Sequence, residues 1–184
     1  MKATEILSSE HQVILRVIHA LEAGASILET NQPINLDFFL DATDFIKGFA
    51  DGCHHAKEEG VLFKAMTEHG VPVNGGPVGV MLAEHEQGRI YTRGMRAATQ
   101  SLIAGDAKSN DELIQNARSY ANLLRMHIYK EDNILFPMAD KVIPIEEHEA
   151  VFEGFERVEH EETGEGVHEK YLALAEKLEK EIAA

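Results

Sequence analysis

A ten-residue segment that occurs twice constrains this chain more than any other feature. The copies begin at His54 and His127 and carry five identical residues at identical offsets. The shared residues are His54, Lys57, Glu58, Leu62 and Phe63 in the first copy and His127, Lys130, Glu131, Leu135 and Phe136 in the second. Residues four apart in a helix lie one turn above each other on one face, so each copy presents an imidazole beside a carboxylate. Two such pairs predict a metal site divided between two parts of the chain.

The repeat extends to a second pair of histidines. His11 and His85 each follow a glutamate. His11 precedes His54 by 43 residues, and His85 precedes His127 by 42 residues. These matched intervals indicate that each half of the chain is one hairpin with its two histidines at fixed places.

Apolar residues recur every three to four positions and strand-like alternation is missing from the sequence, which predicts an all-α fold. At 184 residues the chain suits a single domain. We expect four long helices at about 4–29, 36–68, 78–104 and 110–140, and two shorter ones at about 145–162 and 167–183. The core bundle would span residues 4–140, and a C-terminal helical extension would span residues 144–183.

The positions of the histidines within these helices predict that all four lie at the same height along the bundle axis. His11 and His54 each lie 18 residues from the turn between their helices, which is ~27 Å at the helical rise of ~1.5 Å per residue. Antiparallel packing brings the two side chains level, and the same holds for His85 and His127. Two hairpins related by a pseudo-twofold axis form an up-down four-helix bundle with the donors inside.

Composition excludes several classes of partner. The formal net charge is -15, from 17 Lys and Arg against 32 Asp and Glu, so nucleic acid and anionic membranes are poor partners. No apolar run approaches the ~20 residues of a membrane span, and the first residues lack the apolar segment of a signal peptide. We therefore expect a cytoplasmic protein. The single cysteine, Cys53, excludes an internal disulfide and a thiolate-rich metal site.

Burying two carboxylates beside four imidazoles is costly unless cations neutralise them. A dinuclear metal centre does so, because carboxylates can bridge two cations ~3.5–4 Å apart. The predicted ligands are His11, His54, Glu58, His85, His127 and Glu131. Nitrogen and oxygen donors suit iron, manganese or zinc, and six ligands for two ions leave positions for dioxygen, peroxide, nitric oxide, azide or a bridging oxygen.

The charged neighbours of the predicted ligands are expected outside the site. Glu10 and Glu84 each precede a predicted ligand by one residue, so on a helix they should point away from it, toward solvent. Lys57 and Lys130 are likewise expected at the surface. Gly88, one turn from His85, either makes room near the site or serves helix packing.

The two His-x-x-x-Glu segments followed by Leu-Phe, each with an isolated helix histidine upstream, resemble the hemerythrin-like (HHE cation-binding) family over about residues 4–140. The resemblance implies a four-helix up-down bundle around a non-haem di-iron centre, with two carboxylates and an oxygen atom bridging the irons. It implies four terminal ligands and two bridges, namely His11, His54, His85 and His127, and Glu58 and Glu131.

The sequence departs from the oxygen carriers of that family. Carriers have a His-x-x-x-His pair on the third helix, but Arg89 follows His85 by four residues, which disfavours a reversible oxygen carrier. Carriers also use an Asp five residues after the last histidine. Asp132 has that offset here, whereas the internal repeat favours Glu131.

The resemblance also implies a fifth histidine ligand. We expect His168 in the extension to supply it, with His160 as the alternative, because the tail turns back toward the level of His127. His55 is a third candidate. Its repeat counterpart is Ile128, so we place His55 beside the site or at the surface.

Together with this resemblance, the donor set predicts a di-iron protein that binds, reduces or senses a small diatomic or peroxide ligand, with a redox partner or a homo-oligomer as further partners. Whether it is an enzyme is left open. One alternative is a non-catalytic iron or oxygen sensor whose metal occupancy controls folding of the tail. Others are a metal-storage bundle and a structural bundle filled with zinc.

Overall fold

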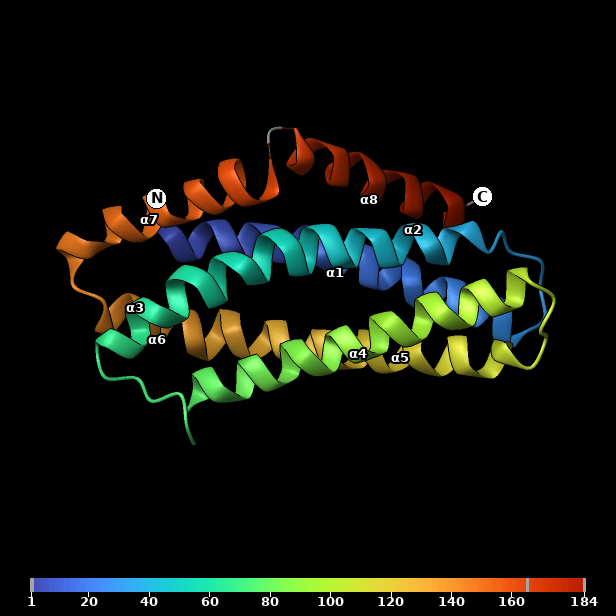
Figure 1. Cartoon of the computed structure of the whole chain (residues 1–184), viewed down its shortest axis with the longest axis horizontal. Helices are drawn as coiled ribbons and strands as arrows, with labels where there is room; N and C mark the ends of the chain where they lie inside the picture. Colours follow the sequence, from blue (N-terminus) through green and yellow to red (C-terminus); the bar gives the residue numbers. More distant parts are fainter. Residues whose placement is uncertain (1, 165, 184) are drawn as a thin grey trace.

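The computed structural model describes residues 2–164 and 166–183, and the protein is all-helical over these ranges, with no strand among them. Most of the helices run close to one long axis (Figure 1). Within the described ranges, every helix is too short or too polar to cross a bilayer. The expected all-α class is therefore confirmed.

Four long helical stretches carry the repeat, and a helical tail follows them. The elements are α1 (Ala3–Glu29), α2 (Asp37–Phe45), η1 (Ile46–His55), η2 (Glu58–Leu62), α3 (Phe63–Glu68), α4 (Pro77–Ile103), α5 (Ser109–Lys130), η3 (Glu131–Leu135), α6 (Phe136–Val142), η4 (Ile145–Glu147), α7 (His148–Arg157), η5 (Val158–Thr163) and α8 (Val167–Ala183). Helical geometry is continuous over 37–68 and over 109–142. The second and fourth expected helices are thus present at nearly the expected bounds.

Wide π-helical turns interrupt both copies of the repeated segment, and the sequence did not predict them. The turns η2 and η3 begin at Glu58 and Glu131, and a longer π stretch, η1, ends inside the first copy at His55. Such turns are rare and often mark functional sites. A π turn has more residues per turn than an α-helix, so neighbouring side chains point in more similar directions than the ~100° step of an α-helix allows.

Two apolar clusters fill the bundle, one on each side of a polar middle. The first cluster includes Ile14, Phe45, Ala50, Met95, Ala121 and Leu124. The second includes Leu7, Leu62, Phe63, Met81, Leu135 and Phe136. Along each long helical stretch a histidine lies between the two clusters, as His11 lies between Leu7 and Ile14 on α1. The core therefore holds the polar residues at one level and keeps water from both sides.

The C-terminal tail lies along the outside of the bundle. The helix α8 packs against α1 and α2, and α7 packs against α1 and η2, as Figure 1 shows. Glycines permit this close approach: a Cβ at Gly48 would overlap the side chain of Tyr171, and a Cβ at Gly154 would come within 2.6 Å of Val61. The tail thus covers one flank of the first hairpin.

Candidate metal centre

The structure brings the six predicted donors together in the polar middle of the bundle. All six side chains are buried. They come from α1 (His11), η1 (His54), η2 (Glu58), α4 (His85), α5 (His127) and η3 (Glu131). Four helical stretches from both halves of the chain therefore contribute to one cluster.

The Glu58 carboxylate lies between two histidines from different halves of the chain. Its Oε1 is 3.5 Å from His54 Nε2, and its Oε2 is 3.4 Å from His85 Nε2. The two oxygens of one carboxylate therefore face two different donor groups, which is the arrangement of a bridging carboxylate.

Glu131 repeats this arrangement with the other two histidines. Its Oε2 is 3.2 Å from His11 Nε2, and its Oε1 is 3.1 Å from His127 Nε2. The oxygens that face His11 and His54 belong to one side of the cluster, and those that face His85 and His127 belong to the other.

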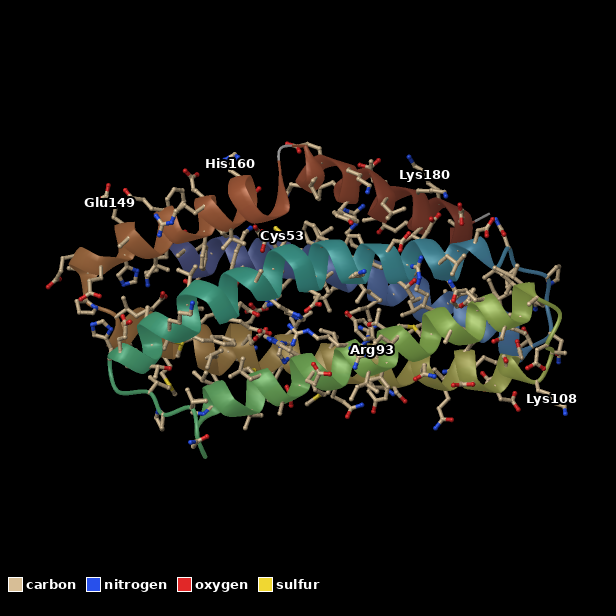
Figure 2. The ribbon with its side chains drawn as sticks, viewed as in Figure 1. Cys53, Arg93, Lys108, Glu149, His160 and Lys180 are labelled. Atoms are coloured by element: carbon tan, nitrogen blue, oxygen red, sulfur yellow. The ribbon has the colours of Figure 1, made fainter. Side chains whose placement is uncertain are left out.

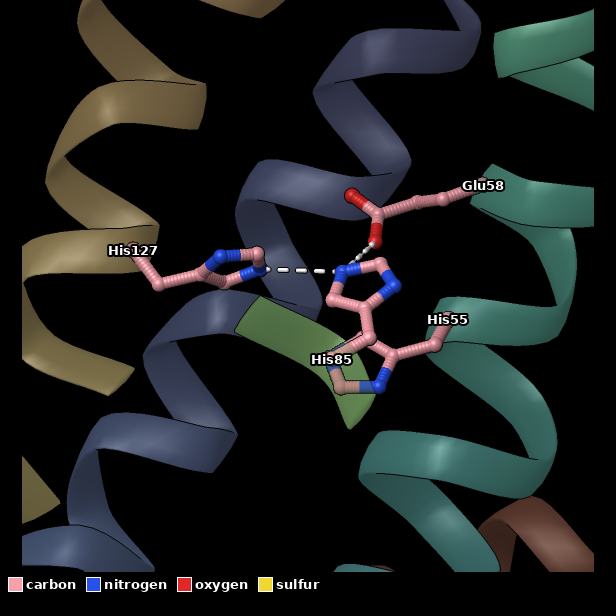
Figure 3. A group of neighbouring side chains, drawn as sticks. All are labelled: His55, Glu58, His85 and His127. Atoms are coloured by element: carbon pink, nitrogen blue, oxygen red, sulfur yellow. Dashed lines mark hydrogen bonds and ion pairs between the residues drawn. The ribbon is translucent and has the colours of Figure 1, made fainter. Parts of the chain in front are cut away.

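Two sets of donors follow from this division. One set is His11, His54, Glu58 and Glu131, and the other is His55, Glu58, His85 and His127; in each set the donor atoms lie within 4.8 Å of one another. Figure 3 shows the second set. Glu58 belongs to both sets, so the cluster has the form of two adjacent cation sites.

A carboxylate fixes the orientation of each of the four histidines from outside. The Nδ1 atoms lie at hydrogen-bond distance from carboxylate oxygens as follows: His11 from Asp132 at 2.9 Å, His54 from Glu10 at 2.9 Å, His85 from Glu59 at 2.7 Å, and His127 from Glu84 at 2.9 Å. An Nδ1–H that donates to a carboxylate leaves the Nε2 lone pair free for a metal. All four Nε2 atoms face the central carboxylates.

The inner polar atoms lack hydrogen-bond partners. Both oxygens of Glu58, both oxygens of Glu131 and Nε2 of His11 are buried without a hydrogen bond among the described residues. Unsatisfied buried polar atoms are costly, and carboxylates more so than neutral groups. A pair of cations in the two donor sets would satisfy all of these atoms at once, so the residues fit such a centre.

The acid–base properties of the cluster show the same need for positive charge. Burial and the neighbouring charge of Glu131 raise the pKa of the Glu58 carboxyl well above its usual range. Burial lowers the pKa of His127, but the combined effects of Glu131 and Glu84 outweigh burial and raise that pKa to about 9. Without metal, protons must therefore supply the charge that cations would supply.

Comparison with known proteins agrees with this geometry. The sequence matches the hemerythrin HHE cation binding domain over residues 2–139. The chain belongs to the hemerythrin HHE cation-binding family. Membership implies that the chain binds metal cations, and the helical bundle with its buried His and Glu clusters is consistent with that family.

The relatives of this hemerythrin-like protein do not narrow its activity. Uncharacterized proteins of Mycobacterium bovis and Mycobacterium tuberculosis are each 26% identical to it over 180 residues, covering 98% of this chain and 70% of theirs. No solved structure gives a significant match.

The fifth histidine in the cluster of this hemerythrin-like protein is His55, which we expected beside the site or at the surface. Its ring is buried and stacks on His85, with ring centroids 3.8 Å apart and planes 13° from parallel (Figure 3). The wide turns of η1 reduce the angle between His54 and its neighbour His55. The repeat gave no signal for it, because Ile128 stands at the matching place.

The structure does not bring His168 into either donor set. His168 lies on α8 at the outer side of the first hairpin, in a separate group with Glu10 and Cys53, and its Nδ1 is 3.5 Å from Glu159. His160, the other tail candidate, is exposed on the outer face of the tail (Figure 2). The tail runs outside α1 and α2, so His168 reaches the back of His54 and not the centre.

The expected solvent exposure of Glu10 and Lys57 is wrong. Glu10 is 4% exposed and Lys57 is 0% exposed. Glu10 does point away from His11, but it reaches across to the next helix, where it accepts hydrogen bonds from His54 Nδ1 and Lys57 Nζ. The repeat could have indicated that Glu10 orients a histidine, since a glutamate precedes both His11 and His85.

Glu84 and Lys130 form the matching pair in the other half. Glu84 accepts hydrogen bonds from His127 Nδ1 and from Lys130 Nζ. Both side chains are partly exposed, so they lie at the surface as expected, but Glu84 also orients a donor. Asp132, the alternative to Glu131, occupies a similar outer position behind His11.

Proposed function

We propose that this hemerythrin-like protein holds two metal ions, iron in the working protein, inside an up-down four-helix bundle. The proposed ligands are His11, His54, Glu58 and Glu131 on one side and His55, His85 and His127 with the shared carboxylates on the other. The observation that supports this most is that opposite oxygens of Glu58 and of Glu131 face opposite histidine groups and lack hydrogen-bond partners. A cation pair needs carboxylates in that position.

The proposed activity is the binding, reduction or sensing of dioxygen, peroxide or nitric oxide. Iron held by nitrogen and oxygen donors would supply electrons to such a ligand. The chain's own residues contribute in three ways: the outer carboxylates hold the imidazoles in one tautomer, the apolar clusters exclude water, and the unequal histidine sets favour ligand entry on the His11 and His54 side. That side offers two imidazoles, whereas the other offers three.

Metal analysis with spectroscopy tests this proposal. We expect two iron ions per chain, and near-ultraviolet absorption that appears on exposure to air and changes with azide. Catalytic consumption of hydrogen peroxide or nitric oxide would identify an enzyme, and saturable binding without turnover would identify a sensor. A spectroscopically silent protein that retains zinc through purification from iron-rich medium would contradict the iron assignment.

Replacing both Glu58 and Glu131 with alanine gives the sharpest genetic test of the metal site. We expect the double variant to lose dinuclear metal loading, because each carboxylate faces histidines of both donor sets. It should remain helical, because burial of two unpaired carboxylates is relieved. Metal content by mass spectrometry and helicity by circular dichroism are the two measurements. Full metal content in this variant would refute the site.

A second candidate function, a sensor that signals through the tail, is favoured by one contact. Lys57 Nζ lies 3.0 Å from Glu159 in η5 while it also binds Glu10, the partner of His54. The tail is therefore joined to a proposed ligand through two ion pairs. Limited proteolysis of residues 144–183 with and without metal tests this function. Equal protection in both states would argue against it.

A further inference from the structure

A cavity of about 270 Å³ lies beside the metal centre, on the flank between α2–η1 and α4. Its inner part reaches the rings of His55 and His85, and the rest of its lining comes from α2, η1, α4 and α5. The proposed function makes no use of this space. It therefore needs its own explanation.

The internal repeat allows the cavity to be compared with the matching position in the other half of the bundle, which is filled by side chains. Pairs of matching residues can be compared because α1 corresponds to α4 and the η1 region corresponds to α5. On the flank with the cavity the lining includes Gly88, Thr92, Asp51 and His55, whereas their counterparts on the other flank are Ile14, Ile18, Leu124 and Ile128. All four counterparts are buried apolar side chains. The bundle thus closes one flank with large apolar residues and leaves the matching flank hollow.

The charged residues that line the rim of the cavity are mostly basic, whereas the chain as a whole is acidic. Four basic residues line it, Lys47, Arg89, Arg93 and Arg96, against one acidic residue, Asp51. The complete chain has 17 basic and 32 acidic residues. The counterparts of the three arginines in the other half are Leu15, His19 and Glu22. These three positions therefore carry arginine only on the hollow flank.

Carboxylates hold the three arginines at the rim without covering them. Arg89 binds Asp51 and Glu59, Arg93 binds Glu86, and Arg96 binds Asp44. The side chain of Arg93 is 65% exposed. Lys47 forms no ion pair among the described residues. An incoming anion can therefore bind Lys47 directly. It can also bind the exposed guanidinium groups alongside the carboxylates that already pair with them.

We propose that this cavity binds a small organic carboxylate, with its apolar body inside and its carboxylate at the basic rim. Size supports this class of ligand, because a cavity of ~150 Å³ accommodates benzene and this cavity is about 270 Å³. An aromatic ring with a short carboxylated chain therefore fits. The pairing of carboxylate with guanidinium is favourable in charge and in geometry. The bound body lies against His55 and His85, so the ligand is placed next to the metal centre.

This proposal does not depend on the identity of the metal, because the cavity lining and the rim charges belong to the chain. Isothermal titration calorimetry with 3-phenylpropanoate on the intact protein provides the test, with metal content measured in each sample. We expect saturable binding with Kd below about 1 mM. The uncharged 3-phenylpropanamide and the small anion acetate should each bind at least about tenfold more weakly, a difference of about 1.4 kcal/mol.

Two kinds of substitution locate the site, one that fills the cavity and one that removes a positive charge from its rim. Gly88→Ile introduces into the cavity the isoleucine that its counterpart, Ile14, places on the filled flank. We expect this change to abolish binding. A Cβ at Gly88 meets Leu124 and Tyr120 at an ordinary 3.6 Å, so a side chain can be built there. If the variant does not fold, Thr92→Ile introduces the counterpart Ile18 and should weaken binding in the same way.

The second kind of substitution, Arg96→Gln, should weaken 3-phenylpropanoate binding about tenfold and leave amide binding unchanged. Arg125→Gln is its matched control, because Arg125 binds Glu22, the counterpart of Arg96, and has a similar side-chain exposure of 42% against 43%. Equal affinity for acid and amide would show a neutral apolar pocket and overturn the proposal. Binding that persists after both Gly88→Ile and Thr92→Ile, or no saturable binding by 3-phenylpropanoate, would also overturn it.

Discussion

His54 and His127 occupy matching places in the two halves, but the residues behind them meet different surroundings. In each half a glutamate accepts hydrogen bonds from the histidine Nδ1 and from a lysine of the repeated segment. Behind His54 the pair Glu10 and Lys57 is 4% and 0% exposed, because the tail lies over it. Behind His127 the pair Glu84 and Lys130 is 20% and 30% exposed.

The comparison separates the properties that the two halves share from those that differ. The hydrogen bonds that orient the imidazoles are the same on both sides, at 2.9 Å in each case. The dielectric surroundings are not the same, since only the first half carries η5 and its Glu159 against the lysine. Substitutions at matching positions can therefore separate the chemistry of the site from the contribution of burial.

The largest expected effect is the loss of stability on removing Lys57, compared with removing its counterpart Lys130. Lys57→Met should lower the free energy of unfolding by about 3–5 kcal/mol, because it leaves buried carboxylate charge without its cation. Lys130→Met should cost less than about 1 kcal/mol, because that pair is partly exposed. Urea unfolding of the metal-free variants measures both values. Similar losses in the two variants would show that burial by the tail does not distinguish the halves.

A smaller and symmetrical effect is expected from the glutamates. Glu10→Gln and Glu84→Gln should each weaken metal binding about tenfold or more, because each removes the negative charge that fixes and polarises the imidazole of a proposed ligand. Chelator competition measures the affinities. Glu22→Gln is the control, since Glu22 is a glutamate that binds Arg125 away from the centre. A loss confined to one of the two variants would indicate that only one half holds metal.

The smallest effect is a dependence on pH in the exposed half. A hydrogen bond from His127 lowers the pKa of Glu84 below its usual 4.5, with a further contribution from Lys130 and against the effect of partial burial. Since the folded-state pKa lies below the unfolded value, the stabilisation is complete above pH 4.5 and is lost as the pH falls through the lowered pKa. The stability difference between the metal-free wild type and Glu84→Gln should therefore shrink in acid. Denaturation curves at several pH values measure it, and a difference that grows in acid would contradict the sign.

Much of the fold followed from the spacing of residues. The apolar period and the turn residues predicted the long helices to within a few positions, because both are local properties of the chain. The six donors that meet in the centre could be named because the repeat places them at equal distances from two turns. Their role as metal ligands stays a prediction.

Other features depend on contacts that no local pattern encodes. His55 lies in the cluster because wide turns precede it, and no residue in the second copy matches it. Glu10 and Lys57 are buried because a distant helix covers them. The position of His168 depends on the path of the tail. Sequence spacing constrains the length of that path but not its direction.

By itself the sequence determined the all-helical class, the two matched hairpins and the level at which six nitrogen and oxygen donors meet, because a helix converts spacing directly into a shared face. The tertiary structure alone decided which charges are buried, which histidine joins as the fifth, and that one flank is hollow. The physical reason is that burial and cavities depend on which surfaces from distant parts of the chain come together.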